Sequence, residues 1–120
     1  MGKLKIGDKH EGGIIFYLDE TGHGLIASPQ DLSGTADWEE AMQYCDEYSN
    51  DGVTGWRLPD TDELNLLFLQ KENIGEYIKF SYWSSTVYAD HFAWFQDFNT
   101  GTRDNDFKDN TCYVRAVKNF

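Results

Sequence analysis

The spacing of apolar residues changes near residue 80, and this change limits the folds that the chain can adopt. In "DWEEAMQYCDEY" and "PDTDELNLLF" the apolar residues recur at helical spacing. After residue 80, "YWSSTVY", "FAWFQDF" and "TCYVRAV" are aromatic or β-branched runs separated by Gly, Asn, Asp and Thr, which is typical of strands. The sequence therefore predicts an α+β domain in which two helices pack on a twisted antiparallel sheet.

Both predicted helices carry the same start signal. Asp37 precedes Glu40 by three residues, and Asp60 precedes Glu63 by three residues. This spacing is that of a capping box, in which the two side chains satisfy free N–H groups of the first turn. We therefore expect one helix to begin directly after residue 37 and the other directly after residue 60.

Three further segments have predictable conformations. Apolar runs at 14–18 and 24–27 flank the turn-forming residues 19–22, which predicts a β-hairpin. A short helical turn is expected over residues 71–77. In the last strand, alternate residues should face opposite sides of the sheet, with Cys112, Val114 and Ala116 on one side and Tyr113, Arg115 and Val117 on the other.

Length and composition indicate one domain, residues 1–120, with a packed core, since 40% of the residues are apolar and 16% aromatic. The net charge of -11 would repel phosphate backbones, so we expect no nucleic-acid partner, and it also disfavours sulfated glycans. No apolar segment is long enough to span a bilayer, so no membrane insertion is expected. The start of the chain lacks the apolar region of a signal peptide.

Five motifs carry a resemblance to a known family. They are "WEEAMQYC", "GWRLPDTDELNLL", "YWSSTVY", "AWFQDF" and "YVRAVKNF". In this order and spacing they resemble the C-terminal domain of bacterial collagen-like adhesins, the Lcl C-terminal type, from about residue 6 to residue 120. The resemblance implies a C-type-lectin-like fold with long C-terminal loops, a place on a bacterial surface, and a tendency to form homo-oligomers.

A narrower resemblance is to the variable proteins of diversity-generating retroelements, which also use C-type-lectin-like domains. Their mutagenesis alters adenines, so an Asn codon can become Asp, His, Phe, Ala, Tyr or Cys, but never Glu, Lys, Gln, Met or Trp. Up to residue 76 the chain has 8 Asp and 8 Glu, whereas from residue 77 it has 5 Asp and no Glu. The preference of turns for Asp explains the same bias without diversification, so both explanations stay open.

The polar stretch "DFNTGTRDNDFKDN", residues 97–110, is predicted to be a ligand-facing surface, held by strands and built from loop side chains between residues 88 and 110. Among the residues from 89 to 112 that diversification could have altered, Trp94, Gln96 and Lys108 would be scaffold positions. Phe92 and Phe107 would be aromatic anchors, although they could equally tuck under the loops. The predicted ligand-binding residues are Tyr88, Ala89, Asp90, His91, Phe92, Phe95, Asp97, Asp104, Asn105, Asp106, Phe107, Asp109, Asn110 and Cys112.

The expected function is non-enzymatic recognition of a cell-surface protein or glycan, by a diversified receptor-binding protein on a virion or bacterial surface. The alternative is an invariant adhesin or assembly domain with a fixed partner. No cofactor and no metal is predicted. Asp104 and Asp106 alternate as calcium ligands do, but Lys108 takes the next ligand position and no Glu follows, which leaves only weak ion binding open.

Catalysis is not expected. Ser84, Ser85 and His91 lie close in sequence, but "SST" within a strand is typical of the sheet itself. C-type-lectin-like domains commonly join their first helix to the terminal strand by a disulfide, which would here link Cys45 and Cys112, whereas two reduced, buried thiols are the other interpretation. The remaining expectations concern structural roles: Trp38, Trp56, Trp83 and Trp94 mostly in the core, and Arg57 and Arg115 paired with acidic groups.

Overall fold

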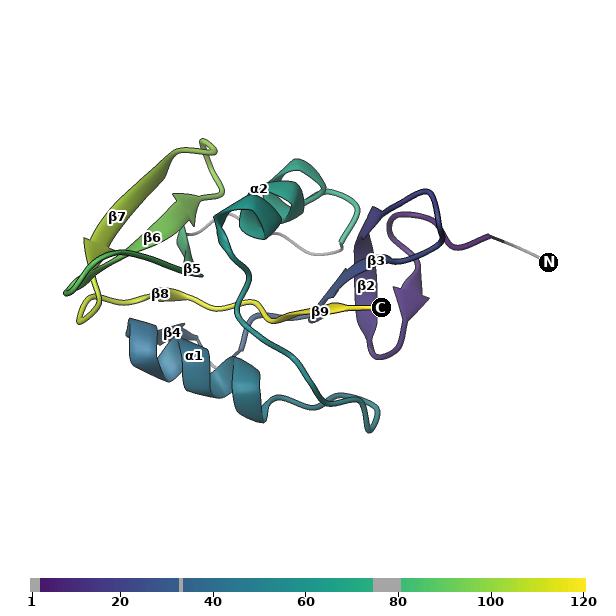
Figure 1. The fold of residues 1–120 in the computed structure, drawn as a ribbon, viewed down its shortest axis with the longest axis horizontal. Helices are drawn as coiled ribbons and strands as arrows, with labels where there is room; N and C mark the ends of the chain where they lie inside the picture. The colour runs from purple at the N-terminus through teal and green to yellow at the C-terminus, as the bar shows by residue number, and fades with distance from the viewer. Residues whose placement is uncertain (1–2, 33, 75–80) are drawn as a thin grey trace.

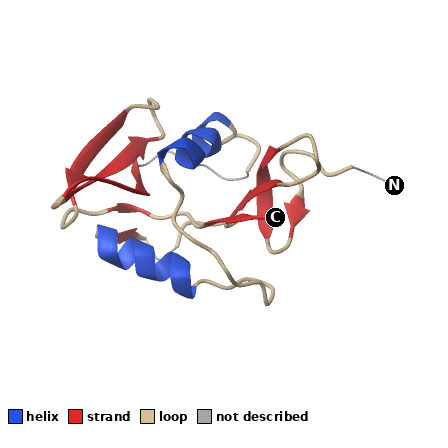
Figure 2. Cartoon of the chain, in the orientation of Figure 1, coloured by secondary structure: helices blue, strands red, loops and turns tan. Residues whose placement is uncertain are grey.

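The computed structural model describes residues 3–32, 34–74 and 81–120, which form two helices and two sheets (Figure 1, Figure 2). The helices are α1 (Trp38–Glu47) and α2 (Thr61–Leu69). The first sheet has the order β1 (Lys9–His10), β2 (Gly13–Leu18), β3 (Gly24–Ala27) and β9 (Val117–Asn119). The second has the order β4 (Thr35–Ala36), β8 (Cys112–Tyr113), β5 (Ser81–Ala89), β6 (Phe92–Asp97) and β7 (Arg103–Phe107).

The α+β class is confirmed, but the single antiparallel sheet is wrong in two respects. The strands divide into two sheets, and β8 pairs with β5 in parallel, with Tyr82 opposite Tyr113. The predicted last strand is also broken, because the segment between β8 and β9 crosses from one sheet to the other. Its three residues, Val114, Arg115 and Ala116, are all buried rather than alternating. The Val114 carbonyl accepts a hydrogen bond from the Leu32 N–H at 2.9 Å, and the Ala116 carbonyl accepts one from the Ser28 N–H at 2.8 Å.

Both helices begin where the sequence predicts. The Asp37 carboxylate accepts a hydrogen bond from the Glu40 N–H at 2.9 Å, and the Glu40 carboxylate accepts one from the Asp37 N–H at 3.1 Å. Asp60 and Glu63 form the same reciprocal pair at 2.8 and 3.0 Å. Each box satisfies N–H groups that a first helical turn leaves free, which fixes where the helix starts.

The predicted hairpin is confirmed as β2 and β3, which pair in antiparallel fashion with Ile15 opposite Ile26. Of the helical turn expected over 71–77, residues 71–73 form a turn, and residues 75–77 lie outside the described residues. No helix in the described part of the chain is long and apolar enough to span a bilayer.

The core consists of two clusters on opposite sides of β5. Trp83 is fully buried in the cluster that includes Ala41 and Cys45 of α1. Its neighbour Tyr82 is fully buried in the cluster that includes Leu64 of α2. Since successive strand residues point to opposite faces, β5 separates two apolar layers, each covered by one helix (Figure 1).

A buried ion pair holds the segment that joins the two sheets. The guanidinium of Arg115, only 4% exposed, donates to the carboxylate of Asp31 at 2.7 Å and to the Ser28 carbonyl at 3.0 Å. The hydroxyl of Tyr82 donates to the same carboxylate at 2.7 Å. Arg57 pairs with Glu63 of α2, so the structural roles expected of both arginines are confirmed.

The molecule is elongated, with extents of 48 × 30 × 25 Å. One end is formed by the first sheet, where the ring of His10 packs on that of Phe120 at 4.6 Å. The opposite end is formed by β5, β6 and β7, which extend beyond both helices (Figure 1). The C-terminus therefore lies beside the first sheet, away from the β5–β7 strands (Figure 1).

Candidate functional site

The stretch 97–110 contains a strand as well as turns, so the long loops expected there are wrong. β7 pairs with β6 in antiparallel register, with Trp94 opposite Asn105 and Phe95 opposite Asp104. The pairing depends on backbone hydrogen bonds, which a polar segment makes as readily as an apolar one. The site is therefore a three-stranded β-meander, β5–β6–β7, with β7 at the edge of the sheet.

Most of the predicted binding residues fall into two segments, 89–92 and 104–110. The structure brings these segments together at the free end of this meander, which we call the tip. Phe92 lies opposite Phe107 in the β6–β7 register. Lys108 fixes the arrangement: its backbone N–H donates to the His91 carbonyl at 2.8 Å and its ammonium to the Asp90 carbonyl at 3.0 Å. The same ammonium lies 4.5 Å from the ring centre of Trp38, so Lys108 also ties the tip to α1.

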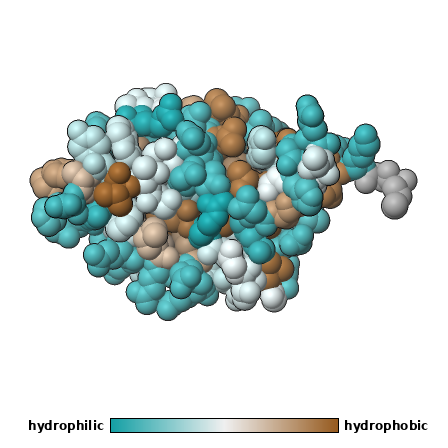
Figure 3. All heavy atoms as spheres, viewed as in Figure 1, coloured by the Kyte–Doolittle hydropathy of each residue, from teal (hydrophilic) through white to brown (hydrophobic). Residues whose placement is uncertain are grey.

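Four aromatic rings cover one side of the tip, and we call this surface the aromatic face (Tyr88, Phe92, Trp94 and Phe107). Tyr88 packs edge-on against Trp94 at 5.4 Å and Phe92 at 6.5 Å, and Phe92 packs against Phe107 at 4.5 Å. Tyr88 is 57% exposed and Phe107 53% exposed. In Figure 3 this end of the molecule shows brown and pale brown residues beside teal and white ones. Such an exposed patch is typical of a binding surface.

The face of β7 opposite the aromatic face is acidic, and its carboxylates accept hydrogen bonds from the backbone. Asp104 and Asp106 lie on the face opposite Phe107, because strand residues alternate. The Asp104 carboxylate accepts from the Asn105 N–H, and the Asp106 carboxylate from the Phe107 N–H, both at 2.8 Å. These two N–H groups point to the open edge of the sheet. We call this edge of β7, with the Asp104 and Asp106 carboxylates bonded to its N–H groups, the capped edge. Filling edge N–H groups in this way hinders pairing with a further strand.

A hollow of about 300 Å³ adjoins the aromatic face and is lined by Thr61 of α2, Trp94 of β6 and Arg103 of β7. Arg103 is exposed, and among the described residues its guanidinium makes no hydrogen bond or ion pair. It therefore differs from Arg57 and Arg115, whose guanidinium groups are paired. Trp94 is half-buried and shared between the hollow and the aromatic face, so it is part of the surface and not only a scaffold residue.

Three residues predicted to bind a ligand lie apart from the exposed surface. Phe95 is half-buried and packs edge-on against Trp83 at 6.5 Å, and the Asp97 carboxylate accepts from the Asn99 N–H within the β6–β7 turn. Cys112 is only 5% exposed, and burial raises the pKa of its thiol to about 12, with the charge of Asp106 acting in the same direction. We therefore exclude Cys112 from the binding surface, because a ligand on the tip cannot reach it.

The other polar candidates at the tip are accessible. Asp109 and Asn110 are exposed in the turn after β7, where the Asn110 amide donates to Asp106 at 2.7 Å. His91 is exposed, whereas the Ser84 hydroxyl is buried and donates to the Trp94 carbonyl at 2.7 Å. Both cysteines are free and buried. No group of three or more His, Cys, Asp or Glu side chains suited to a metal ion occurs among the described residues.

The profile of the Lcl C-terminal domain family matches residues 19–118, which is most of the chain. The chain belongs to the Lcl C-terminal domain family. No curated protein matches the sequence. The match includes the whole β5–β7 meander, and the family indicates an adhesin-like module.

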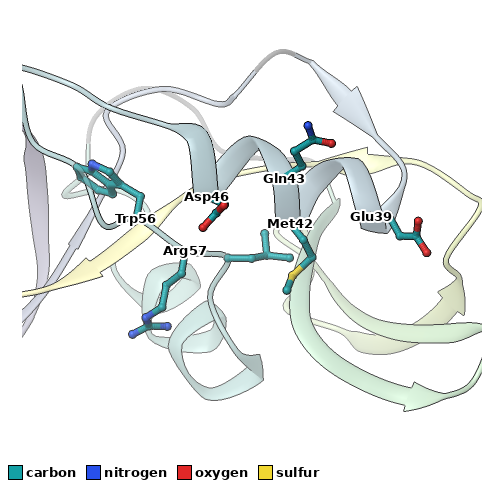
Figure 4. A pocket seen from close by; sticks show the side chains of 7 residues that line it. Glu39, Met42, Gln43, Asp46, Trp56 and Arg57 are labelled. Atoms are coloured by element: carbon teal, nitrogen blue, oxygen red, sulfur yellow. The ribbon is translucent and has the colours of Figure 1, made fainter.

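A second hollow of this Lcl C-terminal domain, about 420 Å³, lies between α1 and residues 56–58 (Figure 4). Its polar groups are already engaged or lie on its rim. Arg57 points away from α1 and is hydrogen-bonded to Glu63 and Asn119, while Gln43 bonds Glu47 along the helix at 3.2 Å. The hollow offers fewer unengaged donors than the one beside Trp94, so the tip is the stronger candidate site.

Sequence reasoning missed Trp94 and Arg103 as site residues of this Lcl C-terminal domain. Trp94 stands in a strand rich in aromatic residues, and its neighbour Phe95 does pack on the core. The available signal was alternation: if Ala93 and Phe95 face inward, then Phe92 and Trp94 face the other side. Whether that other side is covered depends on how α2, whose first residue is Thr61, packs against the strand, which the strand sequence does not reveal.

Proposed function

We propose that this domain is a non-enzymatic recognition module that binds a cell-surface protein or glycan through the aromatic face. The observation that carries the proposal is the set of four contacting rings on the tip, two of them more than half exposed. Exposing such rings to water is unfavourable, and aromatic side chains supply most of the energy in many binding sites.

The mechanism we propose is burial of apolar area on a rigid support. Complete burial of an exposed aromatic side chain yields about 1.5–3 kcal/mol, so three or four rings suffice for a specific contact. The antiparallel ladders and the Lys108 contacts hold the backbone of the tip in place. A preformed surface loses little conformational entropy on binding, which favours affinity.

We further propose that the tip belongs to a diversified receptor-binding protein of a virion or bacterial surface, with varying residues at 89–92 and at 104–110 apart from the scaffold residue Lys108. The juxtaposition of these two segments supports this, because mutations in both would alter one surface. The buried Cys112 does not follow that pattern. The second candidate is an invariant adhesin or assembly domain, favoured by the structural use of Asp104 and Asp106 in the capped edge.

Binding of fluorescently labelled protein to the surface of candidate host cells tests the aromatic face. We expect the triple variant Tyr88→Ser, Phe92→Ser and Phe107→Ser to lose more than about 90% of the bound fluorescence, because it removes the aromatic anchors of the interface. The matched control removes exposed apolar side chains elsewhere (Leu4→Ser, Tyr17→Ser and Leu69→Ser). Equal binding by both triple variants, each shown to be folded by circular dichroism, would refute the proposal.

Sequencing the gene and its flanks from several isolates separates the two candidates. A nearby reverse-transcriptase gene, together with a repeat of the region encoding residues 82–120 that differs at adenines, would establish diversification. Identical codons for 89–92 and 104–110 in all isolates, without such a repeat, would establish the invariant adhesin.

A further inference from the structure

The hollow beside Trp94 bears on the chemical class of the ligand. Its walls come from three separate elements: the start of α2, the middle of β6 and the start of β7. At about 300 Å³ it lies at the lower end of the range of roughly 300–1,000 Å³ that small-molecule sites occupy. A space of this size takes one ring-sized group rather than an extended peptide.

The donors around the hollow are unengaged. Among the described residues, neither the guanidinium of Arg103 nor the hydroxyl of Thr61 makes a hydrogen bond or ion pair, although the backbone N–H of Thr61 donates to Thr86 at 3.2 Å. A guanidinium offers five N–H donors in a planar fork, and a hydroxyl both donates and accepts. Together with the half-buried ring of Trp94, these groups present an apolar wall beside polar groups.

The charge around the hollow disfavours an anionic ligand. Asp60 and Asp62, the exposed sequence neighbours of Thr61, add two carboxylates to the start of α2. The whole chain adds to this repulsion with a net charge of -11. A ligand with many hydroxyl groups and no charge fits these surroundings better than a sulfated or carboxylated one.

We propose that the hollow is a subsite for a neutral pyranose. The apolar side of the sugar ring would lie against Trp94, and its hydroxyl groups would accept from Arg103 and exchange hydrogen bonds with Thr61. The inference rests on the proposed function, since it names a glycan as the class of ligand at the same surface. The remaining rings of the aromatic face would contact the neighbouring sugars or the carrier of the glycan.

The test uses the indole N–H signal of Trp94 in nuclear magnetic resonance spectra of the ¹⁵N-labelled domain. The probes are methyl α-mannoside, methyl β-galactoside and methyl N-acetyl-β-glucosaminide, with glucuronate and glucose 6-sulfate as anionic counterparts. We expect at least one neutral glycoside to shift the signal saturably at millimolar concentration. Arg103→Ala should weaken that binding at least tenfold, whereas Lys3→Ala, which removes an equal charge at the far end of the molecule, should leave it unchanged.

Three outcomes would overturn the inference: no response of Trp94 to any neutral glycoside, a response to the anionic sugars alone, or equal affinity of the Arg103→Ala and Lys3→Ala variants. The proposed function has a separate test. If the glycosides fail but the aromatic-face triple variant still loses cell binding, recognition at the tip stands and the sugar is wrong. Loss of cell binding after protease treatment of the cells, with no competition by glycosides, would indicate a protein ligand instead.

Discussion

The base and the tip of the β5–β7 meander use the same kinds of residue for opposite purposes. At the base, Tyr82 and Trp83 are fully buried between the two helices, and the carboxylate of Asp31 pairs with a buried arginine. At the tip, aromatic rings face solvent, and carboxylates accept hydrogen bonds from N–H groups at the edge of the sheet. What differs is coverage: the strands extend past the helices, so side chains that would be core residues at one end become surface residues at the other.

The largest expected difference between base and tip concerns a single aromatic side chain. Trp83→Ala should reduce the free energy of unfolding by about 3–5 kcal/mol, because it leaves a cavity in the core. It also removes the hydrogen bond from the indole N–H to the Ala36 carbonyl, 2.9 Å long. Phe107→Ala at the tip should cost less than about 1 kcal/mol. Urea titration of both variants measures the difference, and similar losses would mean that the tip is part of the core.

A second difference concerns acidic residues. Asp31→Asn should destabilise the fold by about 3 kcal/mol, because it leaves the guanidinium of Arg115 buried without its counter-charge. This loss of free energy is at the lower end of the range for broken buried ion pairs, since the Asp31 side chain is 25% exposed. Asp90→Asn in the β5–β6 turn is the control and should change the free energy of unfolding by less than about 0.5 kcal/mol. Equal denaturation midpoints for the two variants would contradict the distinction.

A small effect on stability is also expected at the capped edge. The double variant Asp104→Ala and Asp106→Ala should change the free energy of unfolding by less than about 1 kcal/mol. It frees two N–H groups at the open edge of β7, so self-association through that edge should increase, which sedimentation velocity measures.

The control for this experiment is the double variant Asp90→Ala and Asp109→Ala, which removes the same charge without exposing edge N–H groups. It should stay at the association state of the unaltered domain. If both double variants associate to the same degree, the effect arises from lost charge repulsion and not from the edge.

The parts of the fold that sequence predicted are those determined locally. The capping boxes at Asp37 and Asp60 lie within four residues of the helices they start, and the β2–β3 hairpin depends on its own turn. Such short-range signals need no knowledge of the rest of the chain. The division into two sheets depends on contacts between distant segments, such as those of Arg115 with residues 28 and 31, which no local pattern encodes.

The candidate site was predictable in position but not in detail. The stretch 97–110 was identified from its polar, Asp-rich composition, yet the same composition suggested loops where β7 forms a strand. Asp104 and Asp106 illustrate the reason. An edge strand is stabilised by backbone hydrogen bonds to its neighbour, and the acidic side chains of β7 then accept hydrogen bonds from N–H groups at the open edge. Cys112 was misplaced because its neighbours are polar, while its own side chain enters the core through β8.

The placement of residue 3 and Phe120 on the side of the first sheet has a practical consequence. A carrier, tag or solid support attached through either residue would sit beside the first sheet, away from the tip of the meander. Immobilisation through either end would therefore leave the aromatic rings pointing outward and unobstructed. An array of such molecules would display a layer of the same rings at its outer limit, arranged for simultaneous attachment to many copies of a weakly held sugar or protein.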